Sequence, residues 1–211
     1  MTKGMCITYE VERGLYLNIT NKCQNRCDFC IRNNGDGAYG SDSLWLAHEP
    51  TVEEVLCEVF SRDLNKYSEI VFCGYGEPTI RLNECREIAI QIKEKYKNLP
   101  IRINTNGQSD LKFGEDTSPL YKGAFDAVSI SLNTPSAEKY NEICHPVYGL
   151  STFEAILSFA ENVKRYVPYV CFSVVREALS EYELEECRKI ANKVGVFLKI
   201  RDYIGPDSSN T

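Results

Sequence analysis

Short runs of apolar residues recur along the chain, and most are rich in β-branched and aromatic side chains. Runs of this composition, about four to eight residues long, are typical of buried β-strands. The pattern predicts six strands, at residues 15–20, 69–73, 101–105, 127–132, 169–175 and 196–200. Between most of these runs, apolar residues return every three or four positions, which is the spacing of one face of an α-helix.

Recognisable helix starts lie between the predicted strands. Three of them carry a capping box, in which a serine or threonine and a glutamate three residues later each bind the other's backbone N–H. The boxes pair Thr51 with Glu54, Ser151 with Glu154 and Ser180 with Glu183. We also expect helices to begin at Asn83 and at Thr134-Pro135, a cap followed by a first helical position.

Strands that alternate with helices indicate repeated βαβ units and a parallel sheet. Six units are fewer than the eight of a closed barrel. The pattern therefore favours an α/β fold, an open partial (β/α)6 TIM-type barrel with helices on its convex side. We expect a single domain over residues 1–211, with a core at about 15–206 and a frayed tail at 205–211. A flavodoxin-like open sheet remains the structural alternative.

The amino-acid composition argues against some classes of function but does not identify one. The 24 Lys and Arg against 30 Asp and Glu give a net charge of −6, which disfavours an extended nucleic-acid surface. No stretch approaches the ~18 apolar residues of a membrane span. The first residues lack the apolar core of a signal peptide, so we expect a cytoplasmic protein that does not enter the membrane.

Three of the ten cysteines stand close together, directly after the first predicted strand: Cys23, Cys27 and Cys30. The other seven are scattered, and most lie in apolar segments where a buried thiol is the simpler interpretation. Disulfides are rare in the cytosol, so grouped thiolates indicate zinc or an iron–sulfur cluster. Zinc needs a fourth ligand, which His48 could supply, whereas three thiolates leave one iron of a four-iron cluster open.

A second signal follows the second predicted strand, in the sequence Gly74-Tyr75-Gly76-Glu77-Pro78-Thr79. Glycines allow a ligand to approach the backbone, and loops after parallel strands share one rim, where ligands bind. Further polar segments follow the later strands at residues 104–107, 131–133, 176–177 and 202–206.

The long loop at residues 32–49 contains three glycines, and a loop of this length is more often functional than idle. We expect it to close over the substrate cavity when substrate binds. Its apolar cover would come from Tyr39, Leu44, Trp45 and Leu46.

Together these motifs resemble the radical S-adenosylmethionine (radical SAM) superfamily. The resemblance rests on Cys23-x-x-x-Cys27-x-x-Cys30, with aromatic Phe29 before the third cysteine, on Gly76-Glu77-Pro78 and on the six-unit layout. The superfamily motif usually has two adjacent glycines before Glu-Pro. Tyr75 occupies the first of those places here, which a turn acting through its backbone tolerates if the side chain points away.

The resemblance implies that the three cysteines hold a 4Fe-4S cluster whose fourth iron is chelated by the amino and carboxylate groups of S-adenosyl-L-methionine. An electron from an external one-electron donor would cleave this cofactor to a 5′-deoxyadenosyl radical, which abstracts hydrogen from a substrate. The implied cofactor contacts are Tyr75, Gly76 and Glu77 for the amino group, Ser131 and Asn133 for the ribose or carboxylate, Arg176 for the carboxylate, Phe29 and Ile204 beside the adenine, and Asn104 and Asn106 in the segment after the third strand.

Within the superfamily, the chain resembles the TatD-associated radical SAM proteins. The likeness lies in Asn18-Ile19-Thr20-Asn21-Lys22-Cys23, Cys30-Ile31-Arg32 and the glycine-rich turn. It implies a TatD-type hydrolase as a partner but no particular substrate. The compact layout also resembles enzymes that install a glycyl radical on a partner protein, although Asn104 stands where those enzymes usually carry an acidic residue.

The substrate is therefore left open among a peptide, a partner protein and a small-molecule metabolite. Residues that could contact it are Arg32, Asn33, Asn34, Tyr39, Trp45, His145, Tyr148 and Arg176. The alternative enzyme is one that modifies a nucleoside or deazapurine. The alternative outside catalysis is a zinc-binding module.

Overall fold

The computed structural model describes residues 5–203, so the predicted tail and Ile204 lie outside the described residues. Its centre is one sheet of seven strands: β1 (Thr8–Val11), β2 (Gly14–Leu17), β3 (Glu69–Phe72), β4 (Ile101–Thr105), β5 (Ala127–Ser131), β6 (Tyr169–Val175) and β7 (Phe197–Arg201). Strands β2 to β7 are parallel to their neighbours, and β1 pairs antiparallel with β2.

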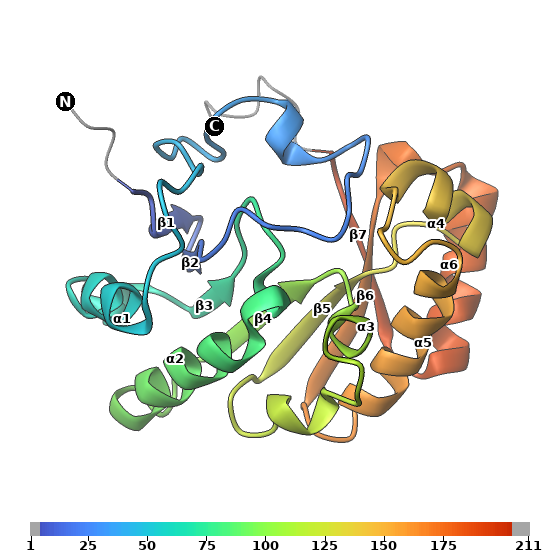
Figure 1. The fold of residues 1–211 in the computed structure, drawn as a ribbon. Helices are drawn as coiled ribbons and strands as arrows, with labels where there is room; N and C mark the ends of the chain where they lie inside the picture. The colour runs from blue at the N-terminus through green and yellow to red at the C-terminus, as the bar shows by residue number, and fades with distance from the viewer. Residues whose placement is uncertain (1–4, 204–211) are drawn as a thin grey trace.

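Six α-helices belong to the described residues: α1 (Val52–Phe60), α2 (Leu82–Lys95), α3 (Ser109–Phe113), α4 (Ala137–Cys144), α5 (Ser151–Val163) and α6 (Glu181–Val194). Figure 1 shows α1, α2, α5 and α6 along the outer face of the curved sheet. Strand order follows chain order from β1 to β7. A flavodoxin-like sheet has the order 2-1-3-4-5, so that alternative is wrong. The prediction of an α/β fold with a largely parallel sheet is confirmed.

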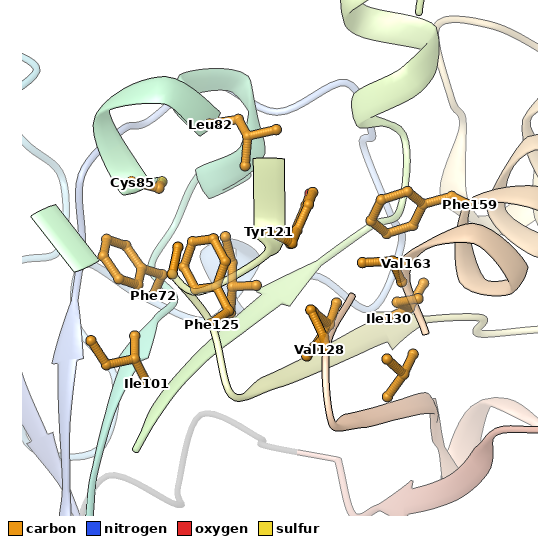
Figure 2. Packing of buried hydrophobic residues seen from close by; sticks show 14 of the residues in the cluster. Phe72, Leu82, Cys85, Ile101, Tyr121, Phe125, Val128, Ile130, Phe159 and Val163 are labelled. Atoms are coloured by element: carbon orange, nitrogen blue, oxygen red, sulfur yellow. The ribbon is translucent and has the colours of Figure 1, made fainter. Parts of the chain in front are cut away.

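The two faces of the sheet differ because side chains along a strand alternate in direction. On β4, Ile101 and Ile103 are buried, whereas Arg102 and Asn104 lie partly exposed on the opposite face. The apolar face packs against the helices, and Figure 2 shows Phe72 beside Phe125 in this core. Their rings meet edge-on with centroids 5.7 Å apart. The core therefore holds the helices against the apolar face of the sheet, and the polar face is not covered by them.

The sheet contains one strand that was not predicted, β1, which lies before residue 15. Its four residues include only a short alternation, and its place depends on a hairpin with β2 rather than on a βαβ unit. The rings of Tyr9 and Tyr16 face each other across this hairpin with centroids 5.3 Å apart. Strand β1 adds an antiparallel edge to the six predicted parallel strands.

Two of the three predicted capping boxes are confirmed, at Thr51 and Ser180. The third is wrong: Leu150 occupies the cap position of α5, and the Ser151 hydroxyl instead donates to the carbonyl of Tyr148. The turn before α5 already has helical geometry, so Ser151 lies inside the helix.

The other two predicted helix starts are displaced. Helix α4 is capped by Ser136, whose hydroxyl accepts from the backbone N–H of Lys139, and not by Thr134. Helix α2 begins at Leu82, one residue before Asn83, without a side-chain cap. No helix among residues 5–203 is long and apolar enough to span a membrane.

Candidate functional site

The loop after β2 carries the three grouped cysteines, which are free, partly buried thiols. This loop is hydrogen-bonded to the C-terminal end of α4. The carbonyl of Cys144 accepts from the backbone N–H of Arg26, and that of Ile143 from Asp28, both at 3.0 Å. The last carbonyls of a helix lack partners within the helix, so the loop satisfies them and is fixed in return. His145 adds a contact of 2.8 Å to the Asp28 carboxylate.

Buried amides hold the same loop from the side of β4. Asn25 donates to the Tyr140 hydroxyl at 2.9 Å, and Gln108 donates to the side-chain carbonyl of Asn25 at 2.8 Å. Asn106 donates to the side-chain carbonyl of Gln24 at 3.1 Å. Asn106 thus positions the loop through its side chain. None of the other four residues stood out in the sequence, because single amides and a tyrosine carry no recognisable spacing.

The sulfur atoms have donors around them. Cys23 Sγ accepts from the backbone N–H of Asn25, and Cys30 Sγ from Nε of Arg32, each at 3.4 Å. Burial, followed by the nearby Glu77 carboxylate, raises the pKa of the Cys23 thiol to about 12. A hydrogen bond with the Cys144 side chain, followed by burial, raises the pKa of the Cys27 thiol. Ligation must therefore displace protons from these thiols, as thiolate ligation always requires.

The donor set fits an iron–sulfur cluster better than a single zinc ion. Within residues 5–203, no three His, Cys, Asp or Glu side chains are placed to hold one metal ion. His48 instead contacts the Glu54 carboxylate at 3.2 Å. A cubane assigns each thiolate to a different iron, so its three ligands do not converge on one point. The Cys-three-His zinc site is therefore not formed in the described part of the chain.

The Glu77 side chain is used inside the protein. It is buried, and its Oε1 accepts from the backbone N–H and hydroxyl of Thr79 at 3.0 and 2.6 Å and from the Thr105 hydroxyl at 2.8 Å. Its Oε2 accepts from the backbone N–H of Asn106 at 2.7 Å. Burial raises the pKa of this carboxyl, and the four donors oppose that shift. The turn after β3 is thereby tied to the end of β4, and its backbone is what remains for a ligand.

Gly76 is required by the packing of the protein itself. A Cβ at this position would lie 2.3 Å from the carbonyl oxygen of Thr20 and 2.6 Å from that of Lys22. The next residue, Glu77, donates its backbone N–H to the same Lys22 carbonyl at 2.7 Å. The absent side chain therefore lets the turn pack against the cysteine loop.

Tyr75 points away from the turn, as its place in the motif requires. Its hydroxyl donates to the carbonyls of Gly35 at 2.7 Å and Gly37 at 3.1 Å. Its ring meets Trp45 edge-on at a centroid distance of 5.0 Å. With Tyr9, Ala38 and Leu44 it forms a small apolar cluster separate from the main core. The loop at 32–49 is thus packed onto the fold.

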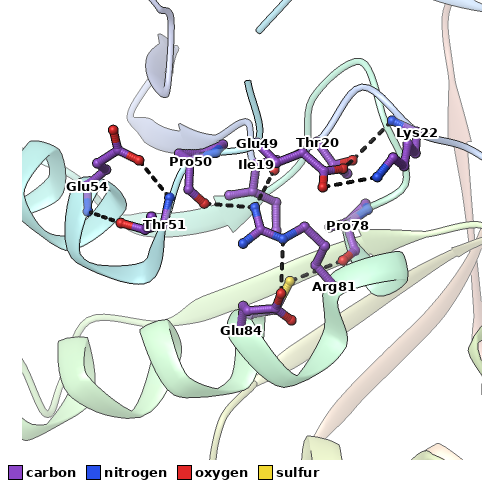
Figure 3. A network of polar contacts seen from close by, with 11 residues as sticks. Ile19, Thr20, Lys22, Glu49, Pro50, Thr51, Glu54, Pro78, Arg81 and Glu84 are labelled. Atoms are coloured by element: carbon purple, nitrogen blue, oxygen red, sulfur yellow. Dashed lines mark hydrogen bonds and ion pairs between the residues drawn. The ribbon is translucent and has the colours of Figure 1, made fainter. Parts of the chain in front are cut away.

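A polar network at the start of α2 fixes both ends of the segment from β2 to α1 (Figure 3). The Arg81 guanidinium donates to the carbonyls of Ile19 and Pro50, each at 2.8 Å. The Thr20 hydroxyl donates to Glu49 at 2.6 Å, and Lys22 pairs with the same carboxylate at 3.2 Å. These contacts therefore fix the cysteine loop and the loop at 32–49 relative to each other.

The other candidate residues are distributed along the rim. Asn104 accepts from Arg102 at 2.6 Å on the polar face of the sheet. Ser131 ends β5 and is partly buried, and Phe29 packs against the main core. Arg176 lies beyond β6 and pairs with Asp202 at 3.5 Å, with about half of its side chain exposed.

Asn133 is the most distinctive of the rim residues. It is 4% exposed and has a φ of 61°, a left-handed conformation that asparagine adopts more readily than most residues. Its Nδ2 donates to Cys144 Sγ at 3.5 Å, whereas its buried Oδ1 has no partner among the described residues. An unmatched buried acceptor is costly, so this atom is suited to accept from a ligand.

The sheet, the cysteine loop and the glycine-rich turn define a protein class that sequence comparison identifies. The profile of the Radical SAM superfamily matches residues 17–192, so the chain belongs to this superfamily of enzymes. The superfamily uses a 4Fe-4S cluster and S-adenosyl-L-methionine.

Two curated relatives give the range of similar proteins. The chain is 29% identical over 195 residues to a probable GTP 3′,8-cyclase of Thermococcus kodakarensis, covering 91% of this chain and 57% of the relative. It is 25% identical over 191 residues to the tungsten-containing aldehyde ferredoxin oxidoreductase cofactor-modifying protein of Pyrococcus furiosus, covering 86% and 49%. The chain therefore spans about half the length of these relatives.

Solved structures share the fold. SuiB of Streptococcus suis, bound to the precursor peptide SuiA, superposes with a TM-score of 0.63 over 93% of this chain and 40% of SuiB. Sequence identity is 14%, so this likeness concerns the fold alone.

Proposed function

We propose that the chain, as a single domain, holds a 4Fe-4S cluster at Cys23, Cys27 and Cys30 and binds S-adenosyl-L-methionine beside it. When bound, the cluster supplies the electron that cleaves this cofactor to methionine and a 5′-deoxyadenosyl radical, which abstracts a hydrogen atom from the substrate. The observation that supports this most directly is the placement of three thiols on one loop that is fixed on two sides. Within residues 5–203, no three His, Cys, Asp or Glu side chains are placed to hold a single ion.

The rim supplies the contacts for the cofactor. The backbone of Tyr75, Gly76 and Glu77 receives the amino group, since the Glu77 carboxylate is already saturated. Ser131 and Asn133 reach the ribose or the carboxylate, and the unmatched Oδ1 of Asn133 accepts from a ribose hydroxyl. Arg176, released from Asp202, pairs with the carboxylate, and Phe29 lies beside the adenine. The predicted adenine contact of Ile204 falls outside the described residues.

Two predicted contacts act indirectly in this proposal. Asn104 is held by Arg102, and Asn106 holds both the Glu77 carboxylate and Gln24. In this proposal both residues position the groups that lie under the cofactor and do not contact the cofactor themselves.

The proposed substrate is a peptide, a partner protein or a small molecule, and the one-electron donor is external. One of the relatives is named for a reaction of GTP, and one neighbouring structure contains a precursor peptide, so both a nucleotide and a peptide have a precedent in similar proteins. The net charge of −6 argues against a large nucleic acid. The likeness to the TatD-associated group adds a TatD-type hydrolase as a partner, and the proposed location is the cytoplasm.

Anaerobic reconstitution tests the proposal. The protein should bind about four irons per chain, and a strong reductant with S-adenosyl-L-methionine should yield 5′-deoxyadenosine and methionine. Replacing Cys23, Cys27 or Cys30 with alanine should abolish both results. The matched controls are Cys57→Ala, an exposed thiol, and Cys187→Ala, a buried one, and both should behave like the unmodified protein. Equal loss of iron from the two groups would contradict the assignment.

A further inference from the structure

Arg32 follows the third cysteine by two residues and begins the loop at 32–49. Its guanidinium turns back onto the cysteine loop. Nε donates to Cys30 Sγ at 3.4 Å, Nη1 to the carbonyl of Asn21 at 3.3 Å and Nη2 to the carbonyl of Asn25 at 3.5 Å. All three nitrogen atoms of the guanidinium therefore donate within this loop, although Arg32 is also among the residues expected to contact substrate.

The two carbonyls that receive the guanidinium lie on either side of the first cysteine, two residues before it and two residues after it. The guanidinium thus spans the loop from Cys23 to Cys30. Its donors form a rigid planar fork, so three partners together determine its position. The ring of Trp45 adds a fourth contact, with its centroid 6.0 Å from the guanidinium carbon. The positive charge of Arg32 is therefore held in a fixed place beside the Cys30 sulfur.

The contacts of the other two sulfurs are of a different kind. Cys23 Sγ accepts from the backbone N–H of Asn25 at 3.4 Å, and Cys27 Sγ lies 3.8 Å from the carbonyl oxygen of Cys144. Of these three contacts, only the one to Cys30 involves a charged group. Hydrogen bonds from a charged donor are shorter and stronger than those between neutral groups, so the contact of Arg32 has the largest electrostatic effect of the three.

We propose that Arg32 is a positioning residue for the iron–sulfur cluster: its guanidinium donates to the Cys30 thiolate and raises the reduction potential of the cluster. This inference rests on the proposed function. When the external donor supplies one electron, the cluster gains one negative charge. A cation bonded to a ligating sulfur stabilises that charge, because net charge and hydrogen bonds to the sulfurs set the potential of such clusters. Arg32 is partly buried, so solvent screens its charge less than that of an exposed side chain.

The same contacts also brace the cysteine loop, which gives Arg32 a structural role in addition. The two roles have different signatures. A brace affects how much iron the loop retains. A charge beside Cys30 also changes the potential of the iron that is retained, and a merely structural residue would leave that potential where it is.

The test measures iron content and the midpoint potential of the reconstituted cluster without S-adenosyl-L-methionine, in an anaerobic redox titration followed by absorbance and electron paramagnetic resonance. Arg32→Met and Arg32→Gln remove the charge and should shift the potential to more negative values. Arg32→Lys keeps the charge without the fork and should restore part of the shift. Arg26→Met is the matched control, since it removes an equal charge from an exposed position on the same loop, and it should shift the potential much less.

The proposal is overturned by a potential that neither neutral variant changes, by a shift in Arg26→Met as large as theirs, or by a shift in Arg32→Lys equal to theirs, which would attribute the effect to displacement of the loop. If one neutral variant loses its iron, the other decides. Loss of iron from both would leave Arg32 a brace alone and also overturn the proposal. Failure of the unmodified protein to bind iron would instead overturn the proposed function, so the two failures are distinguishable.

Discussion

The helix-covered face of the sheet and the rim at the ends of its parallel strands both contain buried side chains, but the two regions are differently built. On the helix face, Phe72, Phe125 and Phe159 interlock with aliphatic side chains and present no polar group to one another. At the rim, Glu77 and Asn25 are also buried, and each of their side chains makes directed hydrogen bonds to other segments. Packing tolerates small displacements, whereas a directed bond to a buried acceptor does not.

Because of this difference, we expect the helix face to determine the stability of the fold and the rim to determine the geometry of the site. The helix face supplies most of the apolar burial, so damage there should weaken the whole fold. The rim joins loops that are far apart in sequence, so damage there should displace the cysteines at a smaller cost in the free energy of unfolding. Four substitutions probe this separation, from the largest expected effect to the smallest.

Phe159→Ala should lower the free energy of unfolding by about 3–5 kcal/mol, because it removes a fully buried ring and leaves a cavity. The Phe159 ring lies against Tyr121 with a centroid distance of 5.3 Å, so the neighbouring side chains have little room to collapse. Urea unfolding gives the value. Phe197→Ala, at a position 64% exposed, serves as the control and should cost much less.

Glu77→Gln should cost about 1–3 kcal/mol, since the new amide group cannot accept from all four donors that now face the carboxylate. The expected signature is a loss of iron on reconstitution that is out of proportion to the loss of stability. Glu84→Gln on α2, where the carboxylate is 40% exposed, is the matched control. An iron content that tracks stability equally in the two variants would remove the distinction between rim and helix face.

Tyr75→Phe should cost about 1 kcal/mol, the net value of a lost hydrogen bond, because the ring keeps its contact with Trp45. Its effect should be local. Backbone amides near Gly35 and Gly37 should exchange with deuterium faster, while those of β4 should not change. Uniformly faster exchange across the sheet would show that Tyr75 belongs energetically to the main core.

Glu183 tests a contact between two helices near the surface, where its side chain and that of Lys139 are 22% and 29% exposed. Its hydrogen bond with Lys139, followed by those with Ser180, lowers its pKa to about 2. The folded pKa lies below the ordinary value of about 4.3, so the contribution is present above that value and is lost as pH falls toward 2. The pair contributes at most about 1 kcal/mol. Unfolding measured between these pH values should show this loss, Glu183→Gln should lack it, and Glu185→Gln should retain it.

The fold was largely predictable because local signals and the final structure agree. Six of the seven strands coincide with apolar runs, and two capping boxes mark helix starts where they were expected. The failures occur where tertiary contacts decide. Strand β1 depends on its hairpin partner, and Ser151 is the first residue of α5 because Leu150, with helical backbone angles, occupies the cap position.

The candidate site was predictable only in its motifs. Spacing identified the three cysteines and the turn at Gly76, but the reason for the glycine is a close approach of Thr20, which no local pattern reveals. Cys144 and Gln108 lie more than a hundred and more than eighty residues from the loop segments they contact. Their sequence neighbours are ordinary helix and turn residues, so the contacts follow from the path of the chain and not from its local composition.

The docking of the cysteine loop on α4 also determines an order of events during synthesis. Cys27 and Cys144 are 117 residues apart, so the three thiols leave the ribosome long before the helix that receives their loop. Until then the loop has no carbonyls to bind at Arg26 and Asp28, and its thiols remain open to stray metals and oxidants. The cysteine loop can therefore take its folded position only after α4 has been synthesised and has folded.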